Sequence, residues 1–235
     1  MTTPTQHTPY GTPESPRLAV RGEARLEVEP ELARISITVS ARGTDRRAAL
    51  DDLGRRNAGV LELIRSYGEA VEKLETGAFV ITPQWSDKGR GERIRAYHGR
   101  VNVTAALADF TALGELVTRL GDLELTSVGG PWWQLRTDSP VRGEARCRAV
   151  REAVLRAREY AGALGAELVA LVELADEGAE TTGGPAVPAA AGGAFYGRSA
   201  ARAEAAAPLD LEPQRQTVYA HVNARFTMSP PDLGE

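Results

Sequence analysis

Three side chains in this sequence are the strongest candidates for acid–base, nucleophilic or metal chemistry: His98, His221 and Cys147. None of them is spaced from another as in the metal-binding and redox motifs HxxxH and CxxC. The sequence also has no GxSxG motif, and the GRG at residues 89–91 is too short to hold a phosphate. Two surface histidines and a small buried thiol are therefore the simplest interpretation. We expect no catalytic residue, no metal site and no cofactor, and hence a protein that is not an enzyme.

A redox function of Cys147 is the alternative for the thiol. Arg146 and Arg148 flank it in the sequence, and neighbouring cations favour the reactive thiolate by lowering the pKa of a cysteine. Because Cys147 is the single cysteine, an intramolecular disulfide and a cysteine-rich zinc site are both excluded.

Asn57, Tyr97 and His98 are the candidate ligand-binding residues. Asn57 interrupts the apolar seam of a predicted helix, where a buried amide bonded to neighbouring backbone is the simpler interpretation. The alternative function is a small-ligand binder or an unrecognised enzyme. Its pocket would be lined by these residues and gated by the loop at residues 178–208.

Aromatic residues mark the candidate interface. Trp132 and Trp133 are consecutive in a predicted strand, so their indoles fall on opposite faces. One ring can enter the core while the other stays exposed as an anchor for a partner. Phe195 and Tyr196 are the bulky apolar residues of the 178–208 loop, and docking of that loop would use them.

The charge balance argues against a nucleic-acid-binding protein. The 235 residues include 28 Lys and Arg against 32 Asp and Glu, a formal charge of −4. Arginines crowd residues 88–100 and 142–158, but glutamates are interspersed among them, which is typical of solvated faces. We expect no nucleic-acid partner.

The sequence contains neither a membrane span nor an export signal that we recognise. No run of about 18 apolar residues is free of charge, and the N-terminal residues lack the basic start and apolar region of a secretory signal. The expected location is cytoplasmic.

Alternation of apolar and polar residues predicts the strands. Residues 18–28 and 33–41 alternate on either side of Glu29-Pro30-Glu31, which predicts an antiparallel hairpin. Pro83 predicts that the strand containing it is an edge strand or has a bulge. The other predicted strands cover residues 74–86, 92–107, 123–137, 167–174 and 218–226.

Apolar residues at three- and four-residue spacing predict three helices. Thr44 caps the first, whose seam runs from Leu50 to Ile64, and Asp109 caps the second, which Gly121 ends. The third covers residues 140–164 and carries a row of alanines at every fourth position: Ala145, Ala149, Ala153, Ala157 and Ala161. A row of small side chains lets a helix approach a sheet or another helix closely.

The expected fold class is α+β, with three helices packed on antiparallel sheets in the order ββα-ββα-β-α-ββ. We predict a disordered leader at residues 1–16, a single domain at 17–228 with one shared interior, and a tail at 229–235. The Ala-, Gly- and Pro-rich residues 178–208 form a mobile insertion that connects two neighbouring strands of one sheet.

This order of elements, with several local sequences, resembles the SIMPL-domain family, a domain of unknown function. The matching segments are VRGEARLEVEPELARISITVSARG, FVITPQW, AYHGRVNVT and EARCRAVREAVLRAREYAGALGAEL, with Asn57 and Val60 in the first helix. The resemblance covers residues 18–228 and implies no catalytic residue. It implies kinship with a bacterial periplasmic protein that builds hollow ring-like assemblies, and with relatives linked to oxidative-stress defence. This chain differs from the periplasmic members in lacking a recognisable export signal.

The expected function is therefore that of a non-enzymatic, self-assembling or binding protein. Long antiparallel strands present edges that invite pairing with another chain. The expected partner is a second copy of the same chain, with no nucleic acid and no membrane. A stress-related role is implied by the resemblance alone.

Overall fold

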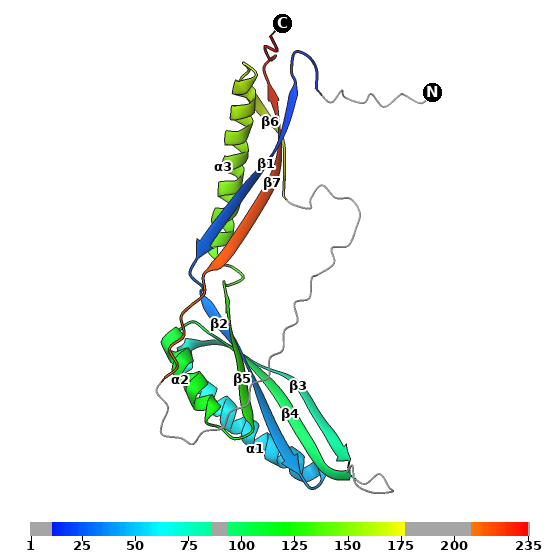
Figure 1. The fold of residues 1–235 in the computed structure, drawn as a ribbon, viewed down its shortest axis with the longest axis vertical. Helices are drawn as coiled ribbons and strands as arrows, with labels where there is room; N and C mark the ends of the chain where they lie inside the picture. Colours follow the sequence, from blue (N-terminus) through cyan, green and yellow to red (C-terminus); the bar gives the residue numbers. More distant parts are fainter. Residues whose placement is uncertain (1–10, 86–93, 177–207, 235) are drawn as a thin grey trace, which may run out of the picture. The chain divides into compact units, whose positions relative to one another are not determined.

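The computed structural model describes residues 11–85, 94–176 and 208–234. The elements follow the expected order and confirm the α+β class (Figure 1). They are β1 (Arg17–Val28), β2 (Leu32–Gly43), α1 (Arg46–Arg65), β3 (Val71–Trp85), β4 (Ile94–Leu107), α2 (Phe110–Gly121), β5 (Thr126–Gln134), α3 (Pro140–Ala163), β6 (Leu168–Asp176) and β7 (Gln216–Met228). Among the described residues, no helix is long and apolar enough to span a membrane.

The described residues divide into two compact units, each with its own sheet. The first unit holds β1, α3, β6 and β7, and the second holds β2 to β5 with α1 and α2. Instead of the one shared interior that the strand patterns predicted, each unit buries its apolar side chains in clusters of its own. The predicted domain limits at residues 17 and 228 stay predictions.

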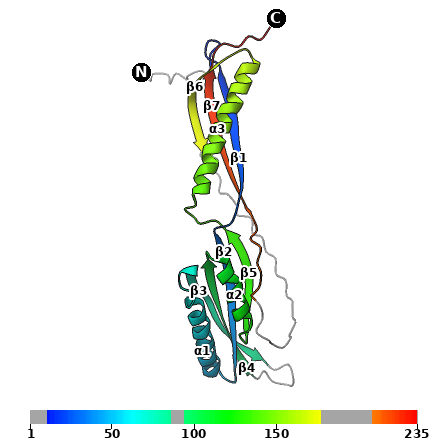
Figure 2. The ribbon, with the colours of Figure 1, turned by 90° about the vertical axis from the view of Figure 1, so that its left-hand side faces the viewer.

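In the first unit, α3 packs on a three-stranded sheet of order β1-β7-β6 (Figure 2). The predicted alanine row faces this sheet, and its members are at most 1% exposed: Ala145, Ala149, Ala153, Ala157 and Ala161. Gly22 of β1 lies against the row, where a Cβ atom would be 2.1 Å from the Ala149 carbonyl oxygen and 2.6 Å from the Ala153 nitrogen. The row therefore allows the close approach of helix and strand backbones that the sequence predicted.

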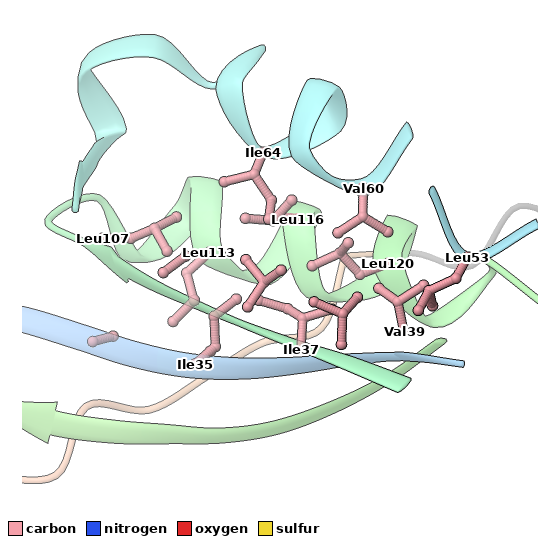
Figure 3. Close-up of a cluster of buried hydrophobic side chains, with 14 of the residues drawn as sticks. Ile35, Ile37, Val39, Leu53, Val60, Ile64, Leu107, Leu113, Leu116 and Leu120 are labelled. Carbon is pink, nitrogen blue, oxygen red and sulfur yellow. The ribbon is translucent and has the colours of Figure 1, made fainter. Parts of the chain in front are cut away.

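In the second unit, α1 and α2 cover one face of a four-stranded sheet of order β3-β4-β2-β5. Figure 3 shows side chains of both helices pointing toward those of β2 and β4. β2 and β4 are antiparallel, with Ile37 opposite Val103, so their alternating apolar residues share the covered face. The opposite face carries the polar side chains that alternate with these apolar residues, among them Ser36, Thr38 and Asn102. The position of Pro83 in β3, at the edge of this sheet, confirms the edge prediction.

The predicted hairpin of the first two strands is wrong. β1 pairs with β7 in the first sheet, whereas β2 pairs with β4 and β5 in the second. Alternation determines which face of a strand is buried, but it carries no information about the strand that pairs with it. The Glu29-Pro30-Glu31 segment connects two sheets and is not a hairpin turn.

The first helix begins one residue later than predicted. Asp45 is its N-cap and accepts a hydrogen bond from the Ala48 backbone nitrogen at 2.9 Å, so Thr44 does not cap it. Ala49 is fully buried, while Leu50, which we expected in the seam, is 45% exposed.

The segment between β6 and β7 connects two neighbouring strands of one sheet, as predicted. Most of the predicted 178–208 loop, with Phe195 and Tyr196, lies outside the described residues, and so do residues 1–10 of the predicted leader.

Candidate functional site

The uncovered face of the second unit's sheet carries a polar side-chain network. In its middle, the hydroxyls of Ser36 and Thr38 both donate to Asn102 Oδ1, at 3.0 and 3.2 Å. These residues alternate with the buried residues of β2 and β4, so the same period that builds the core places them together on this face.

At one end of this face, Arg42 of β2 contacts two side chains. Its Nε donates to His98 Nε2 at 2.8 Å, and its Nη2 donates to Gln84 Oε1 at 3.0 Å. Arg42 is directly opposite His98, which is directly opposite Thr82 of β3. We call the surroundings of this triplet the His98 hollow. It has a volume of about 340 Å³ and is lined by Val80, Thr82, Gln84, His98 and Arg100.

The environment of His98 favours the neutral imidazole. Burial lowers the pKa of His98, and the charges of Arg42 and Arg100 lower it further. Because Nε2 accepts from Arg42, the neutral ring must carry its proton on Nδ1. His98 is thus an acceptor toward Arg42 and a donor at its other nitrogen.

The three candidate ligand-binding residues do not converge. Tyr97 and His98 are consecutive in β4 and point to opposite faces of the sheet. Tyr97 lies at the start of α1, where the Arg46 guanidinium is 6.0 Å from its ring centroid. Asn57 lies between Leu53 and Val60 on the buried seam of α1. The pocket that these three side chains were expected to share is not formed by the described residues.

Asn57 differs from the expected buried amide. Its Oδ1 atom is buried and accepts no hydrogen bond within the part of the chain that the structure describes. The backbone hydrogen bond that we expected for this oxygen is therefore not seen among the described residues.

The two tryptophans occupy opposite faces of β5, as the alternation predicted. Trp133 packs against the core, with its ring edge-on to Phe110 at a centroid distance of 4.9 Å. Trp132 is 47% exposed on the polar face, and the Arg34 guanidinium lies 5.4 Å from its ring centroid. The interface role of both residues stays a prediction.

A second hollow of the same unit was not predicted. It has a volume of about 490 Å³, and its walls include Arg55, Arg56 and Arg119 with the carboxylates Asp122 and Glu124. Arg56 is bound to Asp52 at 2.9 Å, and this hydrogen bond holds the pKa of the Asp52 carboxyl below its usual value. Since these residues come from α1, α2 and the segment before β5, no sequence motif marks them.

Cys147 and His221 belong to the first unit, and neither lines one of the hollows described above. Cys147 is exposed on α3, so the expectation of a buried thiol is wrong. It lies two positions after Ala145, which turns it away from the sheet that the alanine row faces. His221 lies in β7 with its Nδ1 atom 3.9 Å from Glu23 Oε1. No three His, Cys, Asp or Glu side chains of the described ranges could hold a metal ion together.

Comparison with known families decides the identity of the fold. The profile of SIMPL, a protein of unknown function (DUF541), matches residues 18–226. The chain belongs to the SIMPL family. The match runs from β1 to β7 and therefore includes both units. The resemblance seen in the sequence is confirmed.

Two curated relatives of this SIMPL protein carry the same name, 26 kDa periplasmic immunogenic protein. One is from Brucella melitensis biotype 1 and the other from Brucella abortus strain S19. Each is 26% identical to this chain over 172 residues, which cover 70% of this chain and 68% of the relative. Their names contradict the cytoplasmic location that we expected from the N-terminal residues.

The most unusual surface of this SIMPL protein is β6. Four of its apolar side chains are exposed: Val169 (67%), Leu171 (53%), Val172 (42%) and Leu174 (47%). The cluster beneath α3 is built from β1, β7 and α3, and from β6 only Leu168 packs against it. α3 thus leaves this edge strand uncovered. The sequence of β6, LVALVELAD, is a nearly continuous apolar run. Such runs are typical of strands buried on both faces, so the exposure of β6 is the opposite of what its sequence alone would predict.

Proposed function

We propose that this SIMPL protein is a non-enzymatic, self-assembling protein in which β6 of one copy pairs with β6 of a second copy. The observation that supports this most is the exposure of β6, an apolar strand at the edge of its sheet. In the described part of the chain, β7 is the strand that pairs with β6, which leaves the opposite edge open. An open apolar edge pairs readily with another strand.

The other edge of the same sheet is less suited to association. β1 exposes alternating arginines and glutamates, and these side chains form ion pairs within the strand, such as Arg21 with Glu23 at 3.3 Å. Charged side chains on an edge strand oppose pairing with a second chain. β6 carries a glutamate, Glu173, but Arg225 of β7 binds it at 2.5 Å. The β6 edge is therefore the one we assign to association.

Pairing of identical β6 edges is antiparallel and places a two-fold axis between the copies. Each three-stranded sheet then continues into that of its partner, and the exposed apolar side chains of β6 gain cross-strand neighbours that remove part of their surface from water. This partial burial adds to the main-chain hydrogen bonds that form between the two strands.

The absence of enzymatic activity is part of the proposal. His98 belongs to the second unit, whereas Cys147 and His221 belong to the first, so the candidate groups do not share a unit. We place the action of the protein in the periplasm, which the names of the two relatives support.

Sedimentation of the purified chain tests the assembly. We expect the wild type to be larger than a monomer at micromolar concentration. The double variant Val169→Lys/Val172→Lys should sediment as a monomer, because two charges on an edge strand would have to be desolvated on pairing.

Leu155→Lys is the matched control. Leu155 is 55% exposed on α3 of the same unit, so this variant should assemble like the wild type. A wild-type monomer would contradict the proposal, and so would a double variant that assembles as the wild type does.

A further inference from the structure

We infer that the His98 hollow is an oxyanion site that binds a phosphate group, either free or as a monoester. This inference is independent of assembly through β6, because every residue of the hollow belongs to the second unit and β6 belongs to the first. It rests on two neighbours of Arg42, His98 and Gln84. Arg42 occupies an acceptor of each side chain, so each can still donate a hydrogen bond to a ligand.

Arg42 occupies the acceptors of two lining residues. Its Nε–H is bound to His98 Nε2 and its Nη2–H to Gln84 Oε1. With Nε2 occupied, neutral His98 offers its Nδ1–H as a donor. With Oε1 occupied, Gln84 offers its Nε2 amide hydrogens. Arg42 thus acts as a positioning residue that fixes the ring tautomer and the amide orientation of two side chains.

The remaining lining residues complete a set of donors. Arg100 adds a guanidinium, and Thr82 adds a hydroxyl that can donate. No carboxylate is among the described residues that line this hollow. Guanidinium, imidazole, amide and hydroxyl donors together are the usual recognition set for a phosphate oxyanion.

Two other basic hollows of this unit do have carboxylates among their lining residues. The hollow at Arg55 and Arg119 contains Asp122 and Glu124, which would repel an anion. The hollow at Arg34 contains Glu75, which binds Lys73 at 2.8 Å. Positive charge alone therefore does not distinguish the His98 hollow; the lack of a carboxylate among its described lining residues does.

Equilibrium dialysis against inorganic phosphate at pH 7.5 and constant ionic strength tests the inference. We expect saturable binding to the wild-type protein. Arg100→Gln should weaken binding about tenfold, the usual effect of losing one charge-assisted hydrogen bond. Arg34→Gln, on the same face of the sheet, should bind as the wild type does. Competition with glycerol 3-phosphate distinguishes a site for phosphate monoesters from a site for the free ion. If it displaces phosphate, the site accepts monoesters; if it does not, the site binds the free ion.

Arg42→Lys distinguishes positioning from charge. A lysine keeps the charge but cannot hold His98 and Gln84 in the fixed geometry of a planar guanidinium. We expect Arg42→Lys to weaken phosphate binding as much as Arg42→Gln, with the unfolding temperature of both variants recorded to exclude loss of the fold. Absence of saturable binding to the wild type would overturn the inference. Unchanged affinity in Arg100→Gln, or full affinity in Arg42→Lys, would do the same.

Discussion

Arg42 links three strands of the second sheet through side chains that are far apart in the sequence. It lies on β2, His98 on β4 and Gln84 on β3. The alternation of each strand predicts that these residues are on a polar face, and both histidines of the described chain do lie on such faces. The sequence could not predict their contacts, because a contact depends on strand order and register, which alternation does not determine.

The depressed pKa of His98 makes the stability of the second unit depend on pH. Burial, Arg42 on β2 and Arg100 on β4 all disfavour the imidazolium, while the β3 neighbours Thr82 and Gln84 are uncharged. Below the ordinary histidine pKa of 6.5, the unfolded chain binds a proton that the folded chain does not. Stability should therefore be full above pH 6.5 and fall with pH below it, until the folded-state pKa is reached.

Urea unfolding between pH 7.5 and 5.5 measures this dependence. The wild type should lose stability over this range more steeply than His98→Gln, which cannot take up the proton. Arg42→Gln should show an intermediate slope because one of the charges that disfavour the imidazolium is gone. Equal slopes for the wild type and His98→Gln would show that His98 is not the group concerned.

The sequence predicted the type and order of the helices and strands well, but it predicted the pairing of the strands poorly. The alanine row of α3 was correctly assigned to a close contact, because only small side chains fit where backbones nearly touch. Gly22 of β1 contacts this row. We expected β1 to pair with β2, but it pairs with β7. Local patterns reflect burial and turn chemistry, whereas β1 pairs with a strand almost 200 residues later in the chain.

Gly22→Ala tests the close contact between β1 and α3. The added methyl group would lie against the Ala149 carbonyl oxygen and the Ala153 nitrogen, both backbone atoms that cannot rotate away. We expect the free energy of unfolding to fall by about 3 kcal/mol, the upper end of the usual cost of overpacking. Chemical denaturation followed by circular dichroism measures it.

Gly162→Ala is the control for the same unit. Gly162 lies in α3, and nothing is within 4 Å of the position that its Cβ would take. This variant should be neutral or stabilised by up to about 1 kcal/mol, since alanine favours a helix over glycine. A Gly22→Ala protein as stable as Gly162→Ala would refute the close contact.

At the scale of the whole molecule, two units with separate apolar clusters replace the single interior that the strand patterns predicted. The family match spans both, so both are parts of a SIMPL chain. Segment 29–31 carries the turn residues of a hairpin, and nothing local reveals that it connects two sheets. The uncovered β6 is likewise a property of the folded unit, because only the packing of α3 determines which strand is left bare.

Cysteine crosslinking along β6 tests self-assembly through this strand. The native thiol is first removed by Cys147→Ser, since Cys147 is the single cysteine. Single cysteines are then placed at each position from 169 to 174, with Leu155→Cys as the control, and the proteins are mildly oxidised. Paired antiparallel strands bring Cα atoms within about 4.5–5.5 Å, a distance that a disulfide can span. We expect a covalent dimer from at least one β6 position and none from position 155. If no β6 position crosslinks above the level of Leu155→Cys, the protein does not assemble through β6.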